Sequence, residues 1–154
     1  MPRTFHGPVT DLVPHRASML LIDSLLEDTS EYVRVDATVR REQIFCTDDG
    51  LPGWVCVELM AQCVACWAGL RRLERKQEVQ LGFLLGTRRF EIQTPFIPVG
   101  TRLEIDARLE IVSEQGLAVF VCSIFRDGAV IATGSLNVFS PDNVDDYIKE
   151  ALGA

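Results

Sequence analysis

The sequence predicts an α+β domain in which a mostly antiparallel sheet wraps around one long, buried helix. Three observations lead to this prediction. Residues 53–70 are almost continuously apolar over a helical length, several other segments alternate apolar and polar residues as half-buried strands do, and turn-forming residues separate these segments. A curved sheet around a central helix buries the helix on all sides together with one face of each strand.

The elements are predicted in the following order. Three prolines prevent a long helix in residues 1–16, which we expect to be irregular. Two strands come next, the first of them bent, followed by a turn-rich loop over 45–53 and by the central helix from about Gly53 to Gln77. Four more strands and a C-terminal tail over 141–154 complete the chain. The predicted strands are 19–28, 32–39, 82–92, 101–112, 117–127 and 129–140.

Length and composition restrict the class of protein. The 154 residues fit one domain over 1–154, and a hydrophobic content of 47% with 24% charged residues is typical of a globular chain. The formal net charge of −7 argues against nucleic-acid binding, which needs clustered lysine and arginine. The five cysteines, an odd number lying mostly among apolar residues, indicate a reducing compartment, so we expect a cytoplasmic protein.

We expect neither a cofactor nor membrane insertion. Cys63 and Cys66 match C-x-x-C, but they lie within the helix, and no second cysteine pair or histidine cluster completes a metal site. The N-terminus lacks the apolar region of a signal peptide. The apolar stretch 54–70 has 17 residues and includes an acid, whereas a membrane span needs about 20 apolar residues. We therefore interpret this stretch as a core helix.

The apolar helix contains one carboxyl group, that of Glu58, and one amide, that of Gln62. The two residues are four positions apart and share a face of the helix. A carboxylate removed from water must be paired, hydrogen-bonded or protonated. Glu58 is therefore either a structural acid satisfied by Gln62 and backbone N–H groups, or a functional acid whose pKa is raised by burial.

Four motifs follow one another over residues 12–140. They are V-P-H-R with M-L-L-I-D (13–23), P-G-W-V-C-V-E-L-M-A-Q (52–62), G-F-L-L-G with R-F (82–90) and P-F-I-P-V-G (95–100). Together they resemble the hotdog-fold 3-hydroxyacyl-[acyl-carrier-protein] dehydratases, most closely the dehydratase-like proteins of aryl polyene clusters, which share the short P-G-W loop. The resemblance implies the hotdog fold, an antiparallel sheet wrapped around one long central helix.

The resemblance implies dehydration of a 3-hydroxyacyl thioester to the trans-2-enoyl thioester in fatty-acid or polyene biosynthesis. The substrate is expected on acyl carrier protein or, as a second choice, on coenzyme A. A homodimer, or a heterodimer with another hotdog subunit, is also implied, so that the catalytic residues can come from different chains. The sequence departs from the family at Ile44, which replaces the histidine of the G-H-F-P-G loop in the housekeeping enzymes. Of the two histidines, His6 and His15, only His15 lies in a matching motif.

This chemistry needs a base for the C2 proton and an acid for the C3 hydroxyl group. We predict His15 as the base and Glu58, its pKa raised by burial, as the acid. The resemblance assigns oxyanion binding to the N–H group of Gly53, which we expect to be unpaired at the helix start. Gln62 is predicted to orient the Glu58 carboxyl. The alternative role of His15 is structural, in holding its own turn.

The helix ends in four basic residues that have two interpretations. They are a solvated helix end that suits the helix dipole, or a surface that attracts an acidic acyl carrier protein. These residues are Arg71, Arg72, Arg75 and Lys76.

Two other functions remain open. A thioesterase would use the buried carboxylate as base or nucleophile. A non-catalytic subunit that binds acyl chains or carrier protein and completes a heterodimer would fit the missing loop histidine.

Overall fold

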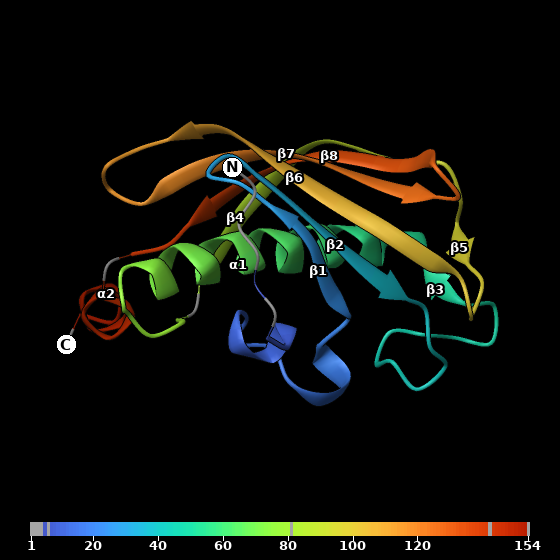
Figure 1. The fold of residues 1–154 in the computed structure, drawn as a ribbon, viewed down its shortest axis with the longest axis horizontal. Helices are drawn as coiled ribbons and strands as arrows, with labels where there is room; N and C mark the ends of the chain where they lie inside the picture. Colours follow the sequence, from blue (N-terminus) through green and yellow to red (C-terminus); the bar gives the residue numbers. More distant parts are fainter. Residues whose placement is uncertain (1–4, 6, 81, 142, 154) are drawn as a thin grey trace.

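The computed structural model describes residues 5, 7–80, 82–141 and 143–153, and it contains a six-stranded antiparallel sheet packed against one long helix (Figure 1). The strand order is β1-β2-β6-β7-β8-β4, so β1 and β4 lie at the edges. The predicted α+β architecture is confirmed. The strands are β1 (Ser24–Asp28), β2 (Tyr32–Thr38), β4 (Phe83–Ile92), β6 (Arg102–Val112), β7 (Leu117–Arg126) and β8 (Ala129–Phe139).

The central helix α1 (Cys56–Glu74) follows a 3-10 turn, Gly53–Val55, and lies against one face of the sheet (Figure 1). The combined segment is long and apolar enough to cross a membrane, but 61% of its apolar window is buried inside the protein. The inner strands alternate buried and partly exposed residues over much of their length, as β2 does over its whole length. Their buried side chains and those of α1 form one apolar core, so the apolar stretch is the core helix that the sequence predicts.

The segment before β1 differs from the prediction. The strand expected over 19–28 begins only at Ser24, because Ala17–Met19 form a 3-10 turn. Leu21 then donates its N–H group to the side chain of Gln62 on α1. The chain is therefore irregular up to β1 and lies close to the helix, which brings its motif residues near the centre of the molecule.

Two elements add to the predicted set. β3 (Leu51–Pro52) and β5 (Phe96–Ile97) form a two-stranded ribbon next to the 3-10 turn. The expected C-terminal tail contains the helix α2 (Val144–Ala151), which lies near the C-terminal end of α1 (Figure 1). Asn143 caps α2 by accepting a hydrogen bond from the N–H group of Asp146, a common way to begin a helix.

Candidate active site

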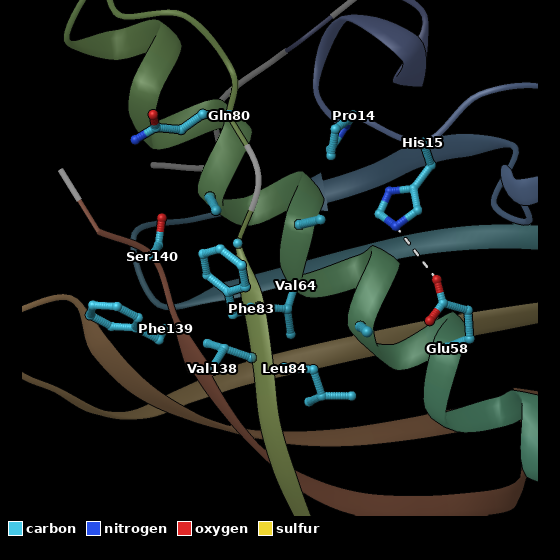
Figure 2. Close-up of a pocket in the computed structure, with 14 residues that line it drawn as sticks. Pro14, His15, Glu58, Val64, Gln80, Phe83, Leu84, Val138, Phe139 and Ser140 are labelled. Carbon is cyan, nitrogen blue, oxygen red and sulfur yellow. Dashed lines mark ion pairs between the residues drawn. The ribbon is translucent and has the colours of Figure 1, made fainter. Parts of the chain in front are cut away.

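A groove of about 180 Å³ runs along α1 between the helix and the strands β4 and β8 (Figure 2). One end holds His15 and Glu58, and the other is formed by Phe83, Phe139 and Ser140. The wall between the two ends is apolar, and α1 contributes three alanines that leave space beside the helix. The residues of this middle part are Ala61, Val64, Ala65, Ala68, Leu84 and Val138.

His15 and Glu58 point toward each other across one end of the groove (Figure 2). Nε2 of His15 lies 3.5 Å from Oε1 of Glu58, and the two side chains are 23% and 31% exposed. A ligand in the groove can therefore reach both groups. His15 and Glu58 of the same chain form this contact. The resemblance also allowed the two residues to come from different subunits. His6 lies outside the described residues.

Gln62 connects Glu58 to the irregular N-terminal segment. Its Nε2 donates to Oε1 of Glu58 at 3.0 Å and to the carbonyl of Met19 at 2.8 Å, while its Oε1 accepts the N–H group of Leu21 at 2.9 Å. The amide is fully buried and is fixed on both sides. This geometry suits the orienting role expected for Gln62.

The pKa of Glu58 differs from the prediction. Burial raises it, but His15 and Gln62, which approach the carboxylate as donors, together with the charge of His15, outweigh burial. The pKa of the Glu58 carboxyl therefore lies below its ordinary value. The expectation that an apolar surrounding keeps this group protonated was wrong, because His15 from the N-terminal segment and Gln62 on α1 stabilise the ionised form more than burial disfavours it.

Two further residues shape the loop that carries His15, Arg16 within the loop and Gly69 where the loop meets α1. The Arg16 guanidinium donates to the backbone carbonyls of Val13 and His15 at 2.6 and 2.7 Å. At Gly69 on α1, a side chain would overlap the carbonyl group of Leu12. A glycine inside a helix costs about 1 kcal/mol, and this cost was the available signal for a close backbone approach.

Gly53 does not have the free N–H group that the sequence reasoning expected. Its N–H group donates to the carbonyl of Pro95 at 2.8 Å. Packing explains the glycine instead, because a Cβ atom there would lie 2.5 Å from the carbonyl oxygen of Thr94. In this chain, Gly53 joins the start of the helix to the segment that leads into β5.

The four basic residues at the end of α1 do not form one surface. Nη2 of Arg71 lies 2.6 Å from Oδ2 of Asp28, a residue only 1% exposed. Arg71 therefore anchors α1 to β1, and its assignment to a docking surface was wrong. Arg72 donates to a backbone carbonyl just beyond the helix. Arg75 and Lys76 are exposed, so docking at these two residues stays a prediction.

The cysteines of α1 are packing residues. Cys56, Cys63 and Cys66 are buried, and burial raises the pKa of Cys56 and Cys66 to about 12. These thiols remain protonated at neutral pH, which makes them poor nucleophiles and poor metal ligands. Within the described part of the chain, no three His, Cys, Asp or Glu side chains come together as metal ligands would.

Several solved structures share this fold. A chain of the dehydratase heterocomplex ApeI:P from Xenorhabdus doucetiae is 34% identical, with a TM-score of 0.88 over 96% of this chain and 99% of that one. The TT0310 protein from Thermus thermophilus is 18% identical, with a TM-score of 0.57 over 75% of this chain and 89% of that one. Thioesterase superfamily member 2 from Mus musculus is 14% identical, with a TM-score of 0.55 over 74% and 78%. The last two similarities concern the fold alone.

The sequence itself matches one family over nearly its whole length. None of the curated proteins matches the chain. The family model described as ApeP-like, the ApeP dehydratase, matches residues 7–149, which include His15, Glu58 and the whole groove between them. Together with the 34% identical structural match, this places the chain, a hotdog-fold protein, in the ApeP-like dehydratase family.

Proposed function

We propose that this chain removes water from a 3-hydroxyacyl thioester on acyl carrier protein and yields the trans-2-enoyl thioester. The observation that carries the proposal is the contact of 3.5 Å between His15 and Glu58 at one end of an apolar groove. The reaction needs a base and an acid close together, and its acyl chain needs an apolar site. Membership of a dehydratase family supports the same reaction class.

The lowered pKa of Glu58 determines how the acid obtains its proton. An ionised Glu58 beside a protonated His15 and a neutral Glu58 beside a neutral His15 contain the same number of protons. The two states differ only in which side of the 3.5 Å contact the proton occupies. A substrate that fills the groove displaces water, which disfavours the two charges and moves the proton onto Glu58.

The neutral pair then contains both groups that the reaction needs. Nε2 of His15 accepts the C2 proton, and the Glu58 carboxyl protonates the C3 hydroxyl group, which leaves as water while the C2–C3 double bond forms. His15 is then protonated and Glu58 ionised, and transfer of the proton across the contact restores the neutral pair without exchange with solvent. General acid–base catalysis of this kind contributes about 10²–10⁴ in rate.

We also propose that a second hotdog subunit completes the site along β4. This edge strand has ten residues and, in the described part of the sheet, pairs with β8 alone. Leu84, which lines the groove, and Leu85 are 42% and 56% exposed. Long apolar edges are normally covered, and a partner strand here would also close the groove. Because the ApeI:P structure is a heterocomplex, we favour a different chain as partner over a second copy.

Acyl carrier protein is the carrier in this proposal, and its encounter with an acidic chain needs local positive charge. Arg75 and Lys76 offer such charge. Reversing both charges should weaken carrier binding, with a larger effect at low ionic strength. An unchanged affinity in titration calorimetry would remove the two residues from the docking surface. Use of a carrier-bound substrate implies a cytoplasmic location.

Two observations favour other functions. The lowered pKa of Glu58 suits a thioesterase, in which the ionised carboxylate activates water. The heterocomplex found for the similar structure suits a chain that contributes groove and binding surface to an active partner.

One experiment separates all three functions. The protein, alone and with its co-purified partner, is incubated with 3-hydroxyacyl carrier protein, and intact-protein mass spectrometry follows the acyl group. Loss of one water supports the dehydratase, and release of the free carrier supports the thioesterase. Turnover that survives in both His15→Ala and Glu58→Ala complexes would assign catalysis to the partner and refute the proposed chemistry of this chain.

A further inference from the structure

We infer that Phe83 and Phe139, supported by the ring of Tyr147 on α2, close the far end of the groove and set the longest acyl chain that the site accepts. This inference rests on the proposed function, because it concerns the acyl chain of the same substrate. It concerns the end of the groove opposite His15 and Glu58 (Figure 2).

The length of the groove limits the length of the acyl chain that it can hold. Glu58 and Ala68 both line it and are ten residues apart on α1, which corresponds to about 15 Å along a helix axis. An extended chain advances about 1.2 Å per bond, since a residue of three backbone bonds spans at most about 3.6 Å. The groove therefore accommodates on the order of ten to twelve carbon atoms beyond the reacting centre.

The far wall consists of two stacked layers. Phe83 and Phe139 line the groove and are directly paired across β4 and β8. The ring of Tyr147 on α2 packs behind them, with centroids 5.3 Å from Phe83 and 5.0 Å from Phe139. Tyr147 itself is not among the groove-lining residues, so it controls the wall by supporting the two phenylalanine rings.

The helix α2, which supports the far wall, is less stable than the elements that form the rest of the groove. α2 has eight residues, which is too short for a stable helix in water without tertiary contacts. Apart from Pro14, His15, Gln80 and Gly82, the other walls belong to the long helix α1 and to strands of the central sheet. Loss of the Tyr147 ring should therefore let the two phenylalanine rings move outward and lengthen the groove, while the core keeps its structure.

The test measures ligand length by binding and by turnover separately. Saturated acyl-pantetheine compounds of increasing length are titrated calorimetrically into the native assembly. Affinity should rise several-fold per added methylene and then fall sharply at the limiting length. Tyr147→Ala should move that limit to chains longer by several carbons, and so should Phe139→Leu. The control Leu152→Ala, at a residue 78% exposed on the same segment, should leave it unchanged.

The outcomes distinguish this inference from the proposed reaction. The inference is overturned if the affinity of the wild type shows no limit in acyl-chain length. It is also overturned if Tyr147→Ala and Phe139→Leu both keep the wild-type limit. A limit that moves as expected in a protein that never removes water supports the inference and contradicts the dehydratase proposal. If the protein dehydrates hydroxyacyl substrates and neither variant changes the limiting acyl-chain length, the dehydratase proposal is supported and the inference is contradicted.

Discussion

Among the described residues, two pairs of ionisable side chains connect α1 to the rest of the chain, one in each half of the helix, and they differ in accessibility. Arg71 and Asp28 are 2.6 Å apart and only 15% and 1% exposed, whereas His15 and Glu58 are 3.5 Å apart and face a groove. A short, buried pair fixes two elements to each other. A longer pair that a ligand can reach keeps both groups available for proton transfer. Geometry, and not the presence of charge on an apolar helix, separates an anchor from a reactive site.

The largest effect expected from this comparison is on turnover. Glu58→Gln keeps the shape of the side chain and removes its proton-donating group, so turnover should fall by about 10²–10⁴ while the melting temperature changes little. The exposed Glu78→Gln serves as the control and should behave as wild type. Steady-state kinetics on assembled protein measures both, and a Glu58→Gln variant with full activity would place the acid elsewhere.

The other pair should respond in stability and not in turnover. Arg71→Met removes the cation that lies 2.6 Å from the buried carboxylate of Asp28, which should lower the free energy of unfolding by about 3 kcal/mol. Turnover per folded molecule should be retained, because neither residue lines the groove. Urea denaturation followed by activity at a temperature where the variant is folded tests the prediction. Specific activity that drops in parallel would show that the two pairs are coupled.

A substitution between the two pairs should have a mixed effect. Gln62→Leu removes three hydrogen bonds, and at about 1 kcal/mol each the free energy of unfolding should fall by about 3 kcal/mol at most. It also removes a donor to Glu58, so the pKa of that carboxyl should rise. The acidic limb of the pH–rate profile should then shift to higher pH. A profile identical to that of wild type would limit Gln62 to a structural role.

The smallest expected effect is the pH dependence of stability at Glu58. The pKa of this carboxyl is lower in the folded chain than its ordinary value of 4.5, so folding favours the ionised form. The resulting stabilisation is present above that ordinary pKa and is lost as the pH falls through the lowered one. Chemical denaturation of wild type and Glu58→Gln should therefore show a difference near pH 7 that shrinks as the pH falls below 4.5. A difference that grows in acid would reverse the direction of the pKa shift.

Much of the fold could be predicted because periodicity reports burial directly. The alternation in β2 predicts a strand with one buried face, and the apolar surface all round α1 predicts a core helix. The structure contains both. The segment before β1 was mistaken for a longer strand because its partner is a side chain, Gln62, from 41 positions further along the chain. No local pattern contains that contact.

The site shows a similar limit. The motifs identified His15 and Glu58, and the structure brings them together. The direction of the Glu58 pKa, by contrast, depends in part on His15 from a different segment, and the N–H group of Gly53 is bound by a carbonyl more than forty residues away. Residue type gives the available chemistry. Protonation and hydrogen-bond satisfaction depend on neighbours that only the folded chain provides.

Because Gly69 has no side chain, the loop that carries His15 lies directly against α1. The distance between the His15 imidazole and the Glu58 carboxyl therefore depends on a position that neither group touches. A methyl group added there would push the loop off the helix and separate two otherwise intact reagents. On the proposed mechanism, a variant with a side chain at this position is inactive although both reactive groups are present. A search for active relatives should therefore require a glycine here together with the histidine and the acid.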